Sequence, residues 1–264
     1  MKRLMTLLIT VLLSQAIATA GDKKDSLAGL KESIMSEYGQ FKPDEWGEKT
    51  TGVGRYLNYL SEDKMVALTF DACGSENDGY DKELIEFLIK EQVQATLFIN
   101  GRWIKKFPKQ FKKLAKDHLF EIENHGTRHV PLSVSGRSVY GIEGTHDAAE
   151  VAEEIEGNAR LIHKLTGRTP LYFRSGTAYY DEVAVLIAQR LGYQVAGFSV
   201  LGDAGATYSR EQVKNALLDA VPGDIIIMHM NHPEKETAEG VMDAIPLMKA
   251  KGITFVKLED WELR

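Results

Sequence analysis

The 264-residue sequence contains a single cysteine, Cys73, so no disulfide can form within the chain and its stability must come from a hydrophobic core. It has no excess of basic residues, because 32 Lys and Arg residues against 38 Asp and Glu residues give a formal charge of -6. That charge argues against nucleic acid as a partner. There is no Gly-x-Gly-x-x-Gly motif and no P-loop, which disfavours a nucleotide-binding sheet. The absence of His-Glu-x-x-His disfavours an unrelated metal-dependent amidase or peptidase.

No apolar run reaches the roughly 20 residues that a membrane-spanning helix needs. The most apolar stretch, Leu4 to Leu13, follows the basic residues Lys2 and Arg3 and precedes the small residues Ala18 to Ala20. This order is typical of a secretory signal peptide over residues 1–20. An uncleaved N-terminal anchor is the alternative, which the small-residue cleavage site disfavours. We therefore expect an exported protein, periplasmic or secreted after cleavage near Ala20, with no stable membrane insertion.

The composition is that of an ordinary globular domain, with 44% hydrophobic and 27% charged residues, which excludes a disordered or fibrous chain. About 240 residues remain after the signal peptide and fit one α/β domain of barrel size better than two small domains. Residues 21–61 are polar and irregular, with a short helix expected near Leu27 to Tyr38. We interpret them as a linker and a segment that wraps the main domain, residues 62–264.

Short apolar runs alternate with amphipathic stretches from Lys64 onward, which is typical of repeated βα units. Strands are expected at Met65–Phe70, Ala95–Ile99, Leu119–Ile122, Leu171–Phe173, Gln194–Val200, Asp224–Met228 and Ile253–Leu258. About seven strands that alternate with helices imply parallel pairing through right-handed crossovers. Such a chain forms either a βα barrel or an open doubly wound sheet, and the pattern alone does not separate the two.

Three helices are marked by their ends. Apolar residues recur on one face over Asp147 to Leu165, and Gly167 stands where a C-terminal cap belongs. A capping box of Ser209 and Gln212 predicts a helix that runs to about Ala220. A further helix, Ala238 to Ala250, contains Pro246, which is expected to kink or shorten it.

Titratable or cationic residues follow five of the expected strands. They are Asp71, His125, Arg174, Asp203 and His229. Because the carboxyl ends of parallel strands meet at one rim, we expect these side chains to lie together there. Arg174 is suited to hold a carboxylate by a bidentate pair, with Asp203 supporting that arrangement.

His125 and His129 lie four residues apart and would share one face if the loop after the strand began with a helical turn. Such a pair can chelate a divalent ion, and a catalytic site would add a carboxylate while leaving one position open. Two surface or hydrogen-bonded histidines are the alternative. Their place directly after a strand favours a metal site.

Asp71 and His229 divide the proton-transfer roles in this interpretation. Asp71 ends an apolar strand and is placed as a general base, although a turn-forming or helix-capping aspartate is the alternative. His229 comes directly out of an apolar run and is the expected general acid, because imidazole titrates near neutrality. We prefer it to His232, which we interpret as a neighbour or a surface residue.

Thr69-Phe70-Asp71, the His125 and His129 pair, Phe173-Arg174, Asp203 and Met228-His229 occur in the order and approximate spacing of five motifs of one family. In these motifs the chain resembles the polysaccharide deacetylases, also called the NodB homology domain or carbohydrate esterase family four. The resemblance covers Met65 to Leu258.

The resemblance implies an incomplete, distorted (β/α) barrel that binds one divalent ion, with zinc expected, and removes acetyl groups from N-acetylhexosamine units of a glycan polymer. It implies Asp71 as general base, His125 and His129 as metal ligands and His229 as general acid. Arg174 would orient Asp71, with support from Asp203. A bacterial cell-wall glycan, peptidoglycan, is the favoured polymer because the signal peptide resembles bacterial ones, while chitin-like oligomers stay open, as do the sugar unit and the oligomeric state.

Two departures from the family pattern matter. The family has a second Asp directly after the first as third metal ligand, and Ala72 stands there. Asp78, Asp81 or Asp71 itself are the candidate replacements, with the Cys73 thiolate as a fourth. The second departure is Ser175-Gly176-Thr177 where prolines are common, and a backbone amide there is a candidate donor to an oxyanion.

Ala72 leaves a rival function open: a catalytically silent carbohydrate-binding protein that has kept the barrel and lost a complete metal site. The Gly- and Ser-containing loop of residues 131–144 follows His129 and is a candidate cover of the groove.

Overall fold

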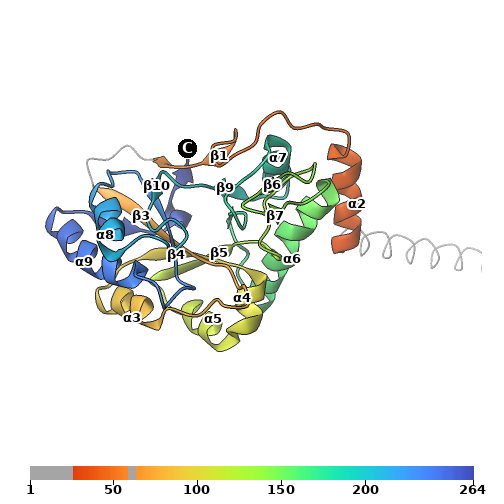
Figure 1. The fold of residues 1–264 in the computed structure, drawn as a ribbon. Helices are drawn as coiled ribbons and strands as arrows, with labels where there is room; N and C mark the ends of the chain where they lie inside the picture. The colour runs from red at the N-terminus through yellow and green to blue at the C-terminus, as the bar shows by residue number, and fades with distance from the viewer. Residues whose placement is uncertain (1–25, 59–63) are drawn as a thin grey trace, which may run out of the picture.

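The computed structural model describes residues 26–58 and 64–264 (Figure 1). The expected signal peptide, residues 1–20, lies outside the described residues. Within the described ranges, no helix has both the length and the apolarity that crossing a membrane requires.

Nine of the described strands form one sheet, and all of its strand pairs are parallel. Their order is β1 (Val53–Gly54), β9 (Gln194–Ala196), β8 (Tyr172–Phe173), β5 (Phe120–Asn124), β4 (Ala95–Ile99), β3 (Met65–Ala72), β11 (Ile225–His229) and β10 (Val200–Leu201), and β12 (Thr254–Val256) also pairs with β3. The sheet curls without a pairing between β1 and β10, its two end strands (Figure 1). The predicted fold class, an incomplete and distorted (β/α) barrel, is confirmed.

The strand expected over Gln194–Val200 is wrong in one respect, since it consists of two strands separated by residues 197–199. β9 pairs with β1 and β8, whereas β10 pairs with β11 at the other end of the sheet. The buried guanidinium of Arg174 donates to the carbonyl oxygens of Ala196 and Gly197, at 3.1 and 2.8 Å. The chain changes its backbone partner at this point, because the Gly197 amide donates to the Gly54 carbonyl, whereas the Ser199 amide donates to the Ile225 carbonyl.

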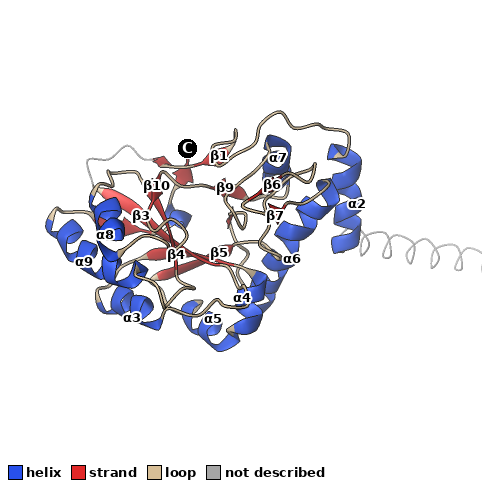
Figure 2. Cartoon of the chain, viewed as in Figure 1, coloured by secondary structure: helices blue, strands red, loops and turns tan. Residues whose placement is uncertain are grey.

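Helices cover the outer face of the strands (Figure 2). They are α3 (Lys82–Lys90), α4 (Gly101–Lys106), α5 (Pro108–Leu114), α6 (Ala148–Thr166), α7 (Glu182–Arg190), α8 (Arg210–Leu218) and α9 (Thr237–Ala250). The predicted capping box of α8 is present, and Gly167 caps α6 in the left-handed conformation. Pro246 does not shorten α9, which continues to Ala250.

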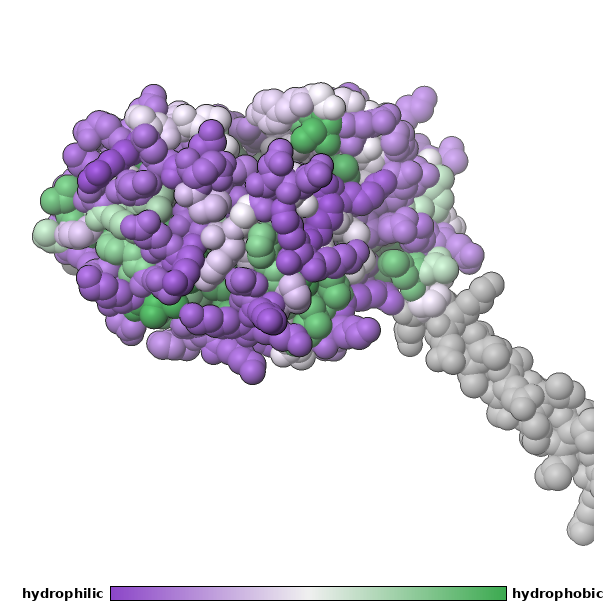
Figure 3. All heavy atoms as spheres, turned by 60° about the horizontal axis from the view of Figure 1, so that its bottom comes forward, coloured by the Kyte–Doolittle hydropathy of each residue, from purple (hydrophilic) through white to green (hydrophobic). Residues whose placement is uncertain are grey.

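The segment before the main domain contributes both a helix and a strand. α2 (Leu27–Tyr38) has the predicted bounds and packs against α6. β1 extends the sheet beside β9. Two short antiparallel pairs complete the described structure: β2 (Leu57–Asn58) with β13 (Glu262–Leu263), after the 3-10 turn Leu258–Asp260, and β6 (Ser138–Val139) with β7 (Ile142–Glu143). The face shown in Figure 3 is mainly hydrophilic, with apolar side chains in small groups.

Candidate functional site

The carboxyl ends of neighbouring strands bring the expected side chains to one rim. Asp71 lies in β3, His125 and Arg174 directly follow β5 and β8, and His229 ends β11. Asp203 follows β10, the neighbour of β11. Asp71, His125, Arg174 and Asp203 are each at most 3% exposed, so these polar groups depend on one another for partners.

Asp71 and Arg174 form a buried ion pair, with Nη1 of the guanidinium 2.8 Å from Oδ1 of the carboxylate. The pair is not the bidentate one that the sequence predicted. The other guanidinium donors bind Thr69 Oγ1 and the two carbonyls at the end of β9, and the group stacks on the Phe98 ring at 4.1 Å. Burial alone raises the pKa of Asp71, but the Arg174 charge, helped by the nearby imidazoles, holds the pKa below its ordinary value.

Half-buried His229 and buried Asp203 form the second pair. His229 Nδ1 lies 2.9 Å from Asp203 Oδ1, while Asp203 Oδ2 accepts the His229 amide and the Thr237 hydroxyl. Burial lowers the pKa of His229, yet the Asp203 charge and hydrogen bond outweigh it, and the pKa rises to about 8. At neutral pH the site therefore combines an ionised carboxylate with a protonated imidazole.

His125 and His129 meet edge to face, with ring centroids 4.9 Å apart. The helical turn that was expected to align them is wrong, because residues 125–129 form an irregular loop and His129 has a left-handed backbone, with φ at 64°. Glu154 of α6 shapes this loop, since its buried carboxylate accepts the backbone amides of Arg128 and His129 at 3.0 Å. The sequence offered one signal for Glu154: an acidic residue on the mainly apolar face of α6.

The loop after β8 passes directly over His129. A Cβ atom at Gly176 would lie 2.3 Å from the carbonyl carbon of His129, so only glycine allows this approach. A backbone amide of residues 175–177 was expected to donate to an oxyanion. The Ser175 amide does not fit this role, because it already donates to the Tyr180 hydroxyl at 3.0 Å.

The carboxylates expected to replace the ligand missing at Ala72 each bind another group of the protein. Asp78 accepts the amide of Ser75 and lies beside His232, and Asp81 caps α3 by accepting the Leu84 amide at 3.0 Å. Asp71 is held by Arg174, although its Oδ2 lies 3.6 Å from Nε2 of His125.

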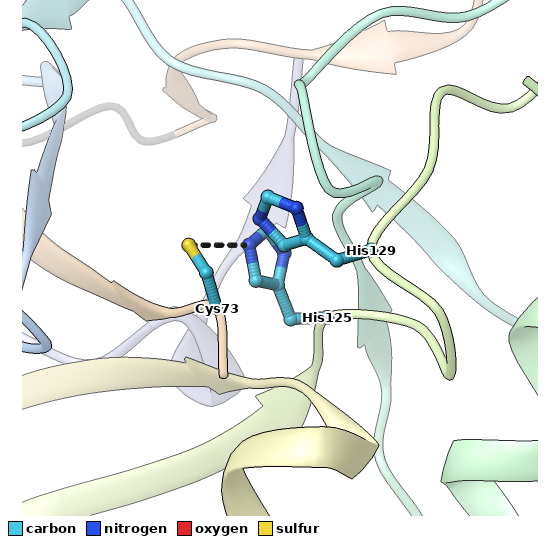
Figure 4. A group of neighbouring side chains, drawn as sticks. All are labelled: Cys73, His125 and His129. Carbon is cyan, nitrogen blue, oxygen red and sulfur yellow. Dashed lines mark hydrogen bonds between the residues drawn. The ribbon is translucent and has the colours of Figure 1, made fainter. Parts of the chain in front are cut away.

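Cys73 lies among the ligand atoms. In the part of the chain that the structure describes, the ligand atoms of Cys73, His125 and His129 all lie within 4.8 Å of one another. Figure 4 shows the three side chains pointing toward one another, with Sγ 3.8 Å from Nε2 of His125. Burial and the neighbouring Asp71 charge raise the pKa of this thiol well above its ordinary value, a balance that a bound cation reverses.

The histidines fit a metal on independent grounds. The Nε2 atom of His129 is buried and has no hydrogen-bond partner among the described residues, a costly state that a cation would relieve. Burial lowers the pKa of both rings, that of His129 to about 3, so the rings are neutral and can act as ligands. Nδ1 of His125 lies 3.0 Å from the Arg174 carbonyl oxygen, which directs Nε2 toward the cluster.

An aromatic cluster flanks the loops of the site, and the sequence interpretation missed it. The Tyr179 ring lies 5.8 Å from Trp46 and 5.7 Å from Tyr140, and Tyr140, in the turn between β6 and β7, is 72% exposed. Trp46 and Tyr179 also line a cavity of about 440 Å³ with residues 45–50. These residues are far apart in the sequence, so only the fold brings them together.

The chain is similar to proteins of known activity. The family model for polysaccharide deacetylases matches residues 59–196. The peptidoglycan-N-acetylmuramic acid deacetylase PdaA of Bacillus subtilis is 28% identical over 245 residues, which cover 83% of this chain and 86% of that protein. The solved structure of Bacillus subtilis PdaA, a family 4 carbohydrate esterase, matches with a TM-score of 0.66 and 25% identity over 87% of each chain.

Two further proteins are similar to the chain. A peptidoglycan-N-acetylglucosamine deacetylase of Bacillus cereus is 27% identical over 234 residues, covering 83% of this chain and 78% of that protein. A family 4 pseudoenzyme of Bacillus anthracis shares the fold, with a TM-score of 0.65, 22% identity and coverage of 88% of this chain and 80% of its own.

Proposed function

The chain belongs to the polysaccharide deacetylase family, and from this premise we propose that it removes N-acetyl groups from N-acetylhexosamine units of a polysaccharide with one divalent metal ion, zinc. The proposal rests on two groups that lie at the same rim of the sheet: the Asp71 carboxylate beside Arg174, and the His229 imidazole beside Asp203. The pKa of Asp71 is lowered and the pKa of His229 is raised to about 8, beside two neutral imidazoles. Amide hydrolysis near neutral pH needs such a base and acid together.

His125 and His129 would hold the metal, whose chemistry when bound is to polarise the acetyl carbonyl and to acidify water. Asp71 accepts a proton from the attacking water as the water oxygen bonds to the carbonyl carbon. Arg174 keeps the carboxylate ionised and oriented through the contact of 2.8 Å. His229 donates its proton to the amine nitrogen as the C–N bond breaks, which releases acetate and a free amino sugar.

The aromatic cluster of Trp46, Tyr140 and Tyr179 supports a sugar polymer as the substrate. Hexose rings have apolar C–H faces that pack on aromatic rings, and these rings combine an apolar body with a polar edge. Tyr179 lies on the same loop as Gly176, which packs on His129. The same loop thus contributes both to the packing around His129 and to the aromatic cluster, as expected if one polymer contacts both.

Peptidoglycan is the polymer we favour, for two reasons. The relatives from Bacillus subtilis and Bacillus cereus are named as peptidoglycan deacetylases. Export through the N-terminal signal peptide would also place the enzyme, periplasmic or secreted, where this polymer lies.

The test measures acetate released from peptidoglycan and from chitin oligomers by the purified protein, with and without chelator. The expected result is release that stops with chelator and returns with zinc. H125A should lose both metal and activity, whereas the matched variant H118N, whose side chain is 80% exposed, should keep both.

A catalytically silent carbohydrate-binding protein is the second candidate, favoured by Ala72 and by the pseudoenzyme with the same fold. Binding of the polymer without any release of acetate, at every metal tested, would establish that function instead.

A further inference from the structure

Strand β3 determines which residues after Asp71 can reach the site. Side chains alternate between the faces of a strand, so Thr69 and Asp71 share one face. Cys73 is the first residue after the strand, and its Sγ lies 3.8 Å from Nε2 of His125. Thr69 and Asp71 both contact Arg174 on that face. Ala72 lies on the other face, where it is fully buried in the hydrophobic core against the helices. A side chain at position 72 therefore points away from the two histidines, and one at position 73 points toward them.

The turn after Cys73 holds its thiol in place. Gly74 has φ at 80°, and a Cβ atom there would lie 2.3 Å from the Trp103 backbone nitrogen in α4. The chain thus turns against the start of a helix, in a conformation that favours glycine. The Cys73 position depends on this packing.

The spacing of the donor atoms matches a shared ion. Bonds of about 2.3 Å to sulfur and 2.0–2.1 Å to nitrogen at a tetrahedral angle place the two atoms roughly 3.6 Å apart. Cys73 Sγ and His125 Nε2 are 3.8 Å apart. The third donor is His129 Nε2, a buried nitrogen for which residues 26–58 and 64–264 supply no hydrogen-bond partner. Cysteine and histidine are also a preferred donor set of zinc.

We propose that Cys73 is the third protein ligand of the metal, so that a Cys-His-His site replaces the carboxylate missing at position 72. This inference rests on the proposed function only for the presence of a metal. Asp78 and Asp81 have other roles, as a turn acceptor and a helix cap. Asp71 then stays free to act as the base. The arrangement leaves one position of a tetrahedral ion open for water or substrate.

The experiment titrates metal-free full-length protein with Co²⁺ and records its absorption spectrum, since a thiolate bound to Co²⁺ gives a charge-transfer band in the near ultraviolet. Wild type should show the band. C73S should lose the band and bind Zn²⁺ more than about 100-fold more weakly, beyond the loss typical of partners that only orient a ligand. D78N is the matched control, because Asp78 is an alternative ligand that the structure uses elsewhere. This variant should keep both the Co²⁺ band and the affinity for Zn²⁺. Bound Zn²⁺ should also protect the single thiol from alkylation.

The outcomes separate this inference from the proposed function. A C73S variant that binds Zn²⁺ as tightly as wild type overturns the inference, as does Co²⁺ binding by wild type without the band, whatever the activity. A band in wild type that disappears in C73S supports it even where no acetate is released. If C73S fails to fold by circular dichroism, the spectrum and the alkylation protection of wild type decide alone.

Discussion

At the residue scale, chemistry in this protein depends on which partner each buried group has. Asp71 is buried and His229 is half-buried, and the loss of solvent alone would favour the neutral form of each. Arg174 keeps the carboxylate ionised, and Asp203 keeps the imidazole protonated. Exchanging one partner should therefore change the pH at which the enzyme works without touching a reacting atom.

D203N is expected to move the alkaline limit of activity to lower pH. In wild type, kcat/KM should fall as the pH rises through about 8, where His229 loses its proton. Removal of the Asp203 charge removes the main cause that raises this pKa, so the fall should begin at a lower pH. The measurement is a pH profile of acetate release, with D78N as control. An unchanged alkaline limit in D203N would exclude His229 as the acid.

G176A is expected to weaken metal binding. The added methyl group would lie 2.3 Å from the His129 carbonyl carbon, so this histidine must move away from the cluster. G141A is the control: its methyl group meets nothing within 4 Å, and the strain of an alanine at φ 75° falls on the turn between β6 and β7, which contains none of the candidate ligands. Isothermal titration with Zn²⁺ should show weaker binding for G176A alone, and equal affinity in both variants would contradict the close approach.

At the element scale, the loop of residues 125–129 depends on a helix that contributes none of the candidate metal ligands. α6 lies outside the barrel, and its Glu154 carboxylate accepts two consecutive amides of the loop. Burial raises the pKa of Glu154, an effect that the loop amides and Arg128 oppose. The Glu154 carboxylate orders the irregular backbone of this loop by accepting its amides, which apolar packing alone cannot do.

E154A is expected to lower the free energy of unfolding by roughly 1–3 kcal/mol, because it leaves two loop amides without an acceptor. It should also lower the affinity for Zn²⁺, since the backbone amide of His129 is one of the two that Glu154 holds. E153A is the matched control, because that neighbouring side chain forms an exposed ion pair with Lys31 and should cost less than about 1 kcal/mol. Urea unfolding and zinc titration measure both effects. Equal losses in the two variants would refute the role of Glu154.

At the scale of the whole molecule, three hydrophobic clusters make up the core, and the candidate site lies at its rim. A core of this size does not need a metal to fold, in contrast to a zinc finger. Metal binding should nevertheless stabilise the native state, because the ligands come from loops of different strands.

Chelator is therefore expected to lower the melting temperature without unfolding the protein at 25 °C. Saturation at 100 times the dissociation constant contributes about 2.7 kcal/mol, which is lost when the ion is removed. Differential scanning calorimetry with and without Zn²⁺ tests this. H125A should show no response to Zn²⁺, and an equal response in H125A would place the ion elsewhere.

The sequence by itself determined the repeated βα units, the bounds of α2, the caps of α6 and α8 and the family, because buried parallel strands and helix ends leave local patterns in residue type. It also identified the residues at the strand ends. It did not predict the break between β9 and β10, because the break depends on backbone partners from distant segments, Gly54 for Gly197 and Ile225 for Ser199.

Only the tertiary structure decided how the candidate metal cluster is composed. Whether Asp78, Asp81 or Cys73 faces the histidines depends on the turn at Gly74, on the cap of α3 and on the loop that Glu154 holds. The aromatic cluster likewise joins residues 46, 140 and 179. These contacts join segments far apart in the chain, and no local pattern in the sequence encodes a distance between them.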